Sequence, residues 1–420
     1  MADPTLPPGA WAPVHAAARR LLSPIQRFLE VEAASGLVLI AATAVALAWA
    51  NSPWAHSYLA LWHTDLTVTL GAWSFARPLH FWVNDGLMTI FFFVVGLEIR
   101  REMYDGALRD LRRAAFPLAA ACGGMAVPAV IYAVVNAGRA GASGWGVPMA
   151  TDIAFAVGVL TLLGRRVAPE LRVLLLALAV IDDIGAILVI AIFYSDGIAL
   201  AGLALIGGGL AAIALLKAAG VRAPTVYVLP GAVVWAGLYQ TGIHPTLAGV
   251  ILGLLTPVRA WSGTADELEP ESSAAHLQHA LHRWVAFAIM PLFALANAGV
   301  ALGGAALGGG AGFVLLGIIA GLVLGKPIGI LLACRLGVGA RVAQRPSNVS
   351  QSGLAVVGVV AGIGFTMSLF IAQLAFPPGP LLETAKLAIL VSSCVAAAAG
   401  LVLGVRRLPA AGEARGPDEA

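Results

Sequence analysis

Long apolar runs, broken by short charged or Gly/Pro-rich stretches, repeat along the chain. A helix needs about 20 apolar residues to cross roughly 30 Å of hydrocarbon. Runs of that kind predict an all-α polytopic membrane protein with twelve transmembrane helices in one domain over residues 33–405. The predicted spans are 33–50, 80–99, 114–135, 147–163, 172–194, 198–216, 224–239, 244–257, 280–301, 311–334, 350–374 and 381–404.

The 29 residues between the first two spans are too many for a simple turn. From Asp65 to Phe75 apolar and polar residues alternate with period two around Gly71, which predicts a small external β-hairpin at about residues 63–76. An exposed hairpin edge can pair with a second copy of the chain, so a homodimer is expected. A self-contained loop is the open alternative.

Composition agrees with a bilayer environment. Hydrophobic residues make up 60% of the 420 residues and charged residues 11%, with a mean hydropathy of +0.90. Soluble domains carry roughly 25% charged residues, so a soluble globular protein is excluded. No basic patch suggests nucleic-acid binding. Cys122, Cys334 and Cys394 lie far apart in apolar runs, which favours packing roles over a metal site or redox pair, and no cofactor is implied.

The positive charges alternate between the two ends of the spans. Twenty-one of the 25 Lys and Arg residues fall on one side, and Arg77, Arg139 and Lys386 fall on the other. The positive-inside rule then places both termini in the cytoplasm. Residues 1–32 are predicted to be a cytoplasmic segment, 262–275 a solvated acidic loop and 406–420 a disordered cytoplasmic tail. The 18-residue run at 33–50 is long for a cleaved signal peptide, so we expect it to be retained.

Five ionisable residues lie inside predicted spans, where a charge costs roughly 2.5–3.5 kcal/mol and therefore suggests function. They are Asp85, Asp152, Asp182, Asp183 and Lys326. Asp182 and Asp183 lie near the middle of their span, and successive helix residues point about 100° apart. One carboxylate can then face a water-filled cavity while the other faces a neighbouring helix, such as the one that carries Lys326. A structural Asp–Lys pair is the alternative.

Two spans contain interruptions. Pro148 and Thr151 precede Asp152 in a span of about 17 residues, and Gly358, Gly362 and Gly364 interrupt the eleventh span just before Thr366. Interrupted segments at corresponding positions are typical of transporter sites. They predict inverted-topology repeats made of spans 3–5 and 10–12, with two discontinuous crossing helices. Asp152 and Lys326 can neutralise the partial charges of the half-helix ends.

Several motifs together resemble the bacterial NhaA-type Na+/H+ antiporter family, a family of inverted-repeat transporters. The resemblance covers roughly residues 23–405. The motifs are Asn84-Asp85, Gly96-Leu-Glu-Ile-Arg-Arg-Glu102, Ala150-Thr-Asp-Ile-Ala-Phe-Ala, Ile181-Asp-Asp-Ile-Gly-Ala, Gly242-Ile-His-Pro-Thr-Leu-Ala-Gly, Leu292-Phe-Ala-Leu-Ala-Asn-Ala-Gly299, Gly325-Lys-Pro and Gly362-Ile-Gly-Phe-Thr-Met-Ser.

The resemblance implies roles for the buried charges. Asp182 and Asp183 are expected to exchange ions and protons, with Lys326 bound to Asp182. Asp152 and Thr151 are expected at the crossing of the broken helices, and Na+ at Asp183, Asp182 and Thr151. Asp85 is expected to be a secondary acid on the cytoplasmic access route.

The resemblance also implies a pH-sensing cluster at the cytoplasmic mouth. Its candidates are Glu98, Arg101, Glu102, Gln278, His279 and His282, with His244 at an external helix start. Gln278 stands where the family pattern suggests an acid, so the pH threshold of this chain is open. Charges at a membrane edge are also ordinary, and His279 with His282 has the spacing of a metal pair but no evident third ligand.

These observations predict a secondary transporter of the bacterial inner membrane that exchanges intracellular Na+ or Li+ for external H+. Competition of cation and proton for one carboxylate gives the exchange, which we expect to be electrogenic and pH-regulated. The main alternative is a cation-coupled symporter of a small organic solute. An intramembrane aspartyl protease lacks its Gly-x-Gly-Asp motif here, and four buried acids fit stoichiometric binding better than a passive channel.

Overall fold

The computed structural model describes residues 34–71, 73–104, 106, 109, 111–195, 199–221, 223–256, 273–301, 310–346 and 348–409. The predicted cytoplasmic segment at 1–32 and nearly all of the predicted acidic loop at 262–275 lie outside these residues, as does the tail from residue 410. Within the described part, helix α17 continues to Arg407, two residues beyond the predicted domain limit.

Helices dominate the described residues, starting with an unlabelled helix over Ala34–Ala50. The α-helices are α2 Ala55–His63, α3 Leu79–Phe81, α4 Met88–Tyr104, α5 Leu111–Val135, α6 Ile153–Leu162, α7 Pro169–Phe193, α8 Leu200–Ala218, α9 Val228–Thr241, α10 Leu247–Leu255, α11 Ser273–Trp284, α12 Met290–Asn297, α13 Ala311–Ile319, α14 Lys326–Gly339, α15 Gln351–Ala361, α16 Phe365–Ala375 and α17 Pro380–Arg407. Short 3₁₀ turns are η3 Ala142–Met149, η4 Gly164–Arg166 and η5 Pro224–Tyr227, and π turns are η1 Trp82–Leu87, η6 Val285–Ile289 and η7 Ala320–Gly325.

Seven of the described helices are long and apolar enough to cross a membrane, and the number rises to ten if each of three bent pairs forms one span. The other two predicted spans, 224–239 and 244–257, coincide with α9 and α10, which have 14 and 9 residues. The polytopic helical architecture is thus confirmed. The count of twelve spans stays a prediction.

The predicted hairpin is present. Strands β1 Asp65–Leu70 and β2 Trp73–Pro78 pair antiparallel, with Val68 opposite Phe75. Helix α2, which precedes the hairpin, is absent from the sequence prediction. It follows the Ala34–Ala50 helix at an angle of 113°. Pro53 lies in the intervening turn, where its missing amide hydrogen cannot continue a helix.

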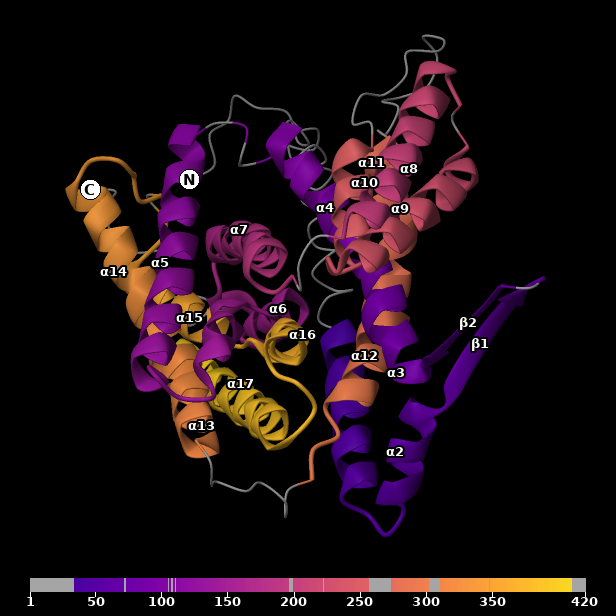
Figure 1. Ribbon diagram of the computed structural model, residues 1–420. Helices are drawn as coiled ribbons and strands as arrows, with labels where there is room; N and C mark the ends of the chain where they lie inside the picture. The colour runs from indigo at the N-terminus through magenta and orange to yellow at the C-terminus, as the bar shows by residue number, and fades with distance from the viewer. Residues whose placement is uncertain are drawn as a thin grey trace, which may run out of the picture.

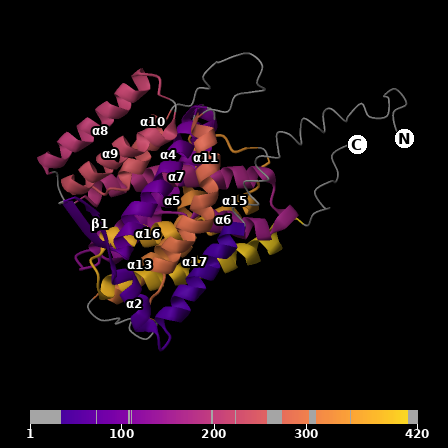
Figure 2. The ribbon, with the colours of Figure 1, turned by 90° about the vertical axis from the view of Figure 1, so that its right-hand side faces the viewer.

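The helices form two groups that lie side by side (Figure 1). The hairpin group contains α2–α4, α8–α12 and the two strands, with tight pairs α8–α9 and α4–α10. The broken-helix group contains α5–α7 and α13–α17, with tight pairs α5–α14 and α13–α17. Contacts between the groups include α4 with α7 and α12 with α16. The view turned by 90° shows helix α2 at the bottom, α11 nearer the top and strand β1 at the left-hand side between them (Figure 2).

Both predicted interruptions occur in the broken-helix group. The chain bends by 42° between η3 and α6 and by 44° between α15 and α16. Residues 150–152 and 362–364 form the two breaks. Gly362 fits its break because a Cβ atom there would lie 2.5 Å from the carbonyl oxygen of Leu322. The two interruptions predicted from Pro148 and from the glycines are therefore confirmed as bends.

Candidate ion-binding site

The two breaks contact each other directly. The amide of Asp152 donates to the carbonyl oxygen of Ile363 at 2.7 Å. The Thr151 hydroxyl lies 2.9 Å from the carbonyl oxygen of Ala361. Backbone groups that leave a helix early must find other partners in a bilayer. Here each broken span satisfies the other, which fixes Thr151 and Asp152 at the crossing.

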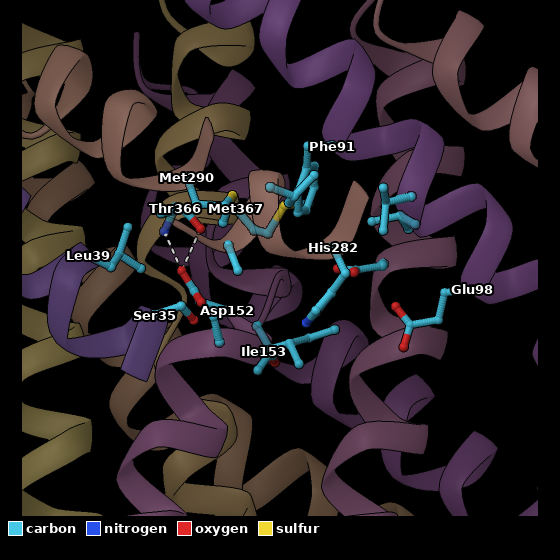
Figure 3. Close-up of a pocket in the computed structure, with 17 residues that line it drawn as sticks. Ser35, Leu39, Phe91, Glu98, Asp152, Ile153, His282, Met290, Thr366 and Met367 are labelled. Carbon is cyan, nitrogen blue, oxygen red and sulfur yellow. Dashed lines mark hydrogen bonds between the residues drawn. The ribbon is translucent and has the colours of Figure 1, made fainter. Parts of the chain in front are cut away.

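Asp152 caps one half-helix and binds another. Its Oδ1 accepts from the Phe155 amide at 3.0 Å at the start of α6. Its Oδ2 accepts from the amide and hydroxyl of Thr366 at 3.1 and 2.5 Å, near the start of α16. Helix N-termini carry partial positive charge, so one carboxylate stabilises both half-helices. Figure 3 shows the two bonds from Thr366. The sequence prediction omits Thr366 as a site residue, although it ends the Gly-rich interruption.

Asp182 is paired with Lys326. The Lys326 ammonium lies 2.5 Å from Asp182 Oδ2, and both side chains are fully buried. Lys326 also donates to the carbonyl oxygen of Met149, the last residue of η3. The Thr151 hydroxyl lies 2.7 Å from the same Oδ2. Lys326 thus offsets both a buried carboxylate and the carbonyl end of a half-helix.

Asp183 faces a cavity of about 70 Å³. The cavity is lined by Asp183, Asp152, Thr151 and Thr366, and by Glu98 and His282 on another side. Asp183 is 2% exposed, and its Oδ1 has no hydrogen-bond partner among the described residues. A water needs about 10–15 Å³ of such space, so the cavity can hold several waters or a partly hydrated cation.

The structure divides the predicted pH-sensing cluster. Glu98 of α4 and His282 of α11 line the cavity with Asp183, and Figure 3 shows them across it from Asp152. Gln278 is buried one turn before His282, and its Oε1 has no partner among the described residues. His279 is exposed on the same helix.

Arg101 and Glu102 lie at the far end of α4, with 4.0 Å between their charged groups.

His244 is not among the residues that line the cavity. The His244 Nε2 lies 2.6 Å from the carbonyl oxygen of Tyr194, just after α7, so this nitrogen carries the proton. The Tyr194 hydroxyl donates to the carbonyl oxygen of Ser143 at 2.8 Å.

Asp85 lies in the π turn η1 near the hairpin, and the structure does not include it among the residues that line the cavity.

In the described part of the chain, no group of three or more His, Cys, Asp or Glu residues is arranged to hold a metal ion. His279 and His282 therefore have no third ligand among those residues. The oxygen-rich site at the crossing suits a hard monovalent cation as cargo.

The sequence profile of the Na+/H+ antiporter 1 family matches residues 26–403. This match covers nearly all of the chain. The chain belongs to the Na+/H+ antiporter 1 family. Two similar relatives are both named Na(+)/H(+) antiporter NhaA 2. The one from Sorangium cellulosum is 52% identical, and the alignment covers 95% of this chain and 93% of the relative. The one from Myxococcus xanthus is 51% identical, and the alignment covers 99% of this chain and 96% of the relative. The Na(+)/H(+) antiporter NhaA of an Acidovorax species is 53% identical over 92% and 93%.

Membership of the Na+/H+ antiporter 1 family makes the chain a multi-pass membrane transporter and not an enzyme. The resemblance seen in the motifs is therefore confirmed at the level of the family. The crossing of the two broken helices, with its buried carboxylates, is the candidate site of transport in this family member.

Proposed function

We propose that the protein exchanges intracellular Na+ or Li+ for external H+ across the bacterial inner membrane, with both termini in the cytoplasm. The observation that carries this proposal is the Asp183 carboxylate, which is buried at the wall of a small cavity with one oxygen atom unpartnered in the described structure. The family and the names of its relatives agree with sodium/proton exchange.

Competition for Asp183 explains the exchange. A bare carboxylate is costly away from water, so a buried one is expected to hold either a proton or a cation. Hard cations prefer oxygen ligands. Asp183, Asp182 and Thr151 supply such oxygens, but Asp182 is occupied by Lys326 at 2.5 Å. Sodium can use Asp182 when Lys326 withdraws, and loss of a proton from Lys326 is then expected to accompany binding.

This coupling makes the cycle electrogenic. If Asp183 and Lys326 each release one proton when one Na+ binds, two protons enter for each Na+ that leaves, and about one net charge moves inward. A potential of 100 mV supplies about 2.3 kcal/mol per charge. A tenfold sodium gradient opposes with roughly 1.4 kcal/mol. The membrane potential can therefore drive sodium out of the cell.

Regulation by pH is proposed for the mouth of the cavity. Glu98 and His282 line the same cavity as Asp183, and His titrates near neutral pH. A change of charge on His282 would alter the field at the site. Gln278, one helical turn away, has no charge to add, and we propose that it shifts the pH threshold.

The small cavity disfavours the symporter alternative. Sites for small organic molecules usually enclose about 300–1,000 Å³. The cavity beside Asp183 has about 70 Å³. It fits a cation with a few waters, whereas an organic solute would need a different shape of the site.

Proteoliposomes with an imposed pH gradient test the proposal. We expect Na+ and Li+, but not K+ or choline, to dissipate the gradient, and we expect Asp183→Asn to abolish this response. Asp65→Asn, the same change at an exposed hairpin residue, is the matched control and should transport normally. An absence of response at every pH from about 6.5 to 9 in the unmodified protein would contradict the proposal. Absence of current on solid-supported membranes would contradict the electrogenic part.

A further inference from the structure

Four polar side chains form a cluster between the two helix groups, in which two members are buried and two are partly buried. This amide cluster consists of His80, Asn84, Asn297 and Gln373, from α3, η1, α12 and α16. Asn297 Nδ2 donates to Asn84 Oδ1 at 2.8 Å. His80 Nε2 lies 2.9 Å from Asn297 Oδ1. A polar group inside a span is costly even when it is hydrogen-bonded, and more so when it is not. The presence of four polar side chains in one place therefore suggests that they have a function.

Gln373 connects the groups through both ends of its amide. Gln373 Nε2 donates to Asn297 Oδ1 at 2.5 Å, and Asn84 Nδ2 donates to Gln373 Oε1 at 2.5 Å. Gln373 belongs to the broken-helix group, whereas Asn84 and Asn297 belong to the hairpin group (Figure 1). These two hydrogen bonds therefore cross the boundary along which the groups can separate.

An aromatic layer separates the amide cluster from the ion cavity. Phe370 of α16 lies 5.3 Å from Phe92 of α4 and 6.3 Å from Phe293 of α12, measured between ring centroids. All three rings are at most 2% exposed. Each of the three spans passes from the cavity through this layer to the cluster. The series are Thr366, Phe370 and Gln373; Met290, Phe293 and Asn297; and Val95, Phe92 and Asn84.

The two faces of the protein are therefore sealed differently. Towards the hairpin, the aromatic layer and the amide cluster close the path from the cavity. Towards the other end of α4, the cavity is lined by Glu98 and His282, which are both partly exposed. The polar side chains of Glu98 and His282 therefore lie on the side of the cavity that points away from the hairpin.

We propose that the amide cluster is the latch that closes the ion path at the hairpin face, and that the two hydrogen bonds of Gln373 break once in each transport cycle. The proposal rests on the exchange function proposed above. Release of an ion at the hairpin face requires the groups to part where α12 meets α16. Neutral amides suit this role because they bond less strongly than charged pairs and can exchange their partners for water.

Reversible cross-linking tests the latch. In a variant without Cys122, Cys334 and Cys394, the pair Asn84→Cys/Gln373→Cys joins the two groups. The matched control, Asn84→Cys/Asn297→Cys, joins two residues of the hairpin group in the same layer. A short bifunctional methanethiosulfonate is added, and sodium-driven dissipation of a pH gradient is measured before, during and after cross-linking.

We expect cross-linking of the Asn84→Cys/Gln373→Cys variant to slow sodium-driven dissipation of the pH gradient at least tenfold. In the control variant the same rate should fall less than twofold. Reduction of the cross-link should restore the rate. Equal transport by both cross-linked pairs would overturn the latch. The uncross-linked proteins report on exchange itself, so failure of the proposed function is seen as inactivity of the unmodified chain, independently of the latch.

If the double-cysteine variants do not transport even before cross-linking, the rate of thiol labelling at residue 373 tests the latch instead. A single Gln373→Cys variant is exposed at the hairpin face to a membrane-impermeant thiol reagent. Sodium is expected to increase the labelling rate at least threefold, and Asp183→Asn in the same chain should remove this increase. A labelling rate that does not respond to sodium would overturn the latch.

Discussion

Adjacent acids in α7 have opposite surroundings. Asp182 lies 2.5 Å from the Lys326 ammonium and 2.7 Å from the Thr151 hydroxyl, whereas Asp183 faces the cavity. The turn of about 100° between successive helix residues produces this difference. One carboxylate is thereby held by a cation, while its neighbour borders the cavity.

The first prediction concerns the stability of the Asp182–Lys326 pair. Lys326→Met leaves a fully buried carboxylate without its cation, and breaking a buried pair costs about 3–5 kcal/mol. We expect a clear drop of the thermal unfolding midpoint in detergent. The double variant Lys326→Met/Asp182→Leu replaces both charges by apolar groups, which is often nearly neutral. The double variant should therefore unfold at nearly the same temperature as the unmodified protein. A double variant as unstable as the single one would contradict this account.

The sequence identifies the charged residues of the site better than the uncharged ones. Asp152, Asp182, Asp183 and Lys326 are conspicuous because charges within apolar runs are rare. Amides and hydroxyls are less costly than charges inside a membrane span, so they occur there more often. The residue types of Thr366 and Gln373 alone therefore do not mark them as site residues. Their importance depends on partners that lie on other spans, which periodicity within one span does not reveal.

Among the helices, prolines and glycines reveal the bends but not the π turns. Pro148 and the Gly-rich run at 358–364 predict the two broken spans, with bends of 42° and 44°. Three other spans contain the π turns η1, η6 and η7, and η7 directly precedes Lys326. Such turns often accompany functional sites. They depend on the packing around each helix, so the local sequence did not predict them.

The second prediction concerns the contact of α5 with α14, the helix that begins with Lys326. A Cβ atom on Gly329 would lie 2.1 Å from the carbonyl oxygen of Gly123, so the two backbones pack without side chains between them. Small residues permit such close packing of membrane helices. Gly329→Ala is expected to separate the helices and to lower the amount of folded protein that survives heating in detergent.

Gly339→Ala is the control for that measurement, because the same addition at the end of α14 meets no atom within 4 Å. Stability is measured by size-exclusion chromatography after heating. If the two variants were equally stable, the close contact at Gly329 would not support α14.

At the scale of the whole molecule, the structure consists of two groups that meet at the candidate ion site. The crossing of the broken helices lies in one group, while Glu98 and His282 come from the other. Transport between two faces requires such a site to lie at a movable boundary. Apolar runs predicted the helices, but the division into groups arises from long-range packing that a single sequence does not display.

The third prediction concerns assembly through the hairpin. Leu66 and Val68 are 46% and 43% exposed on β1, and their alternation places them on the same face of the strand. An exposed apolar strand at the edge of a sheet favours pairing with a second chain. We expect the protein to form a homodimer in detergent, and Val68→Lys to shift it to the monomer without loss of folding. Thr67→Lys adds the same charge on the opposite face and should leave the dimer intact. Light scattering after size-exclusion chromatography distinguishes the two states, and an equal dimer fraction in both variants would show that this face of the hairpin does not join the subunits.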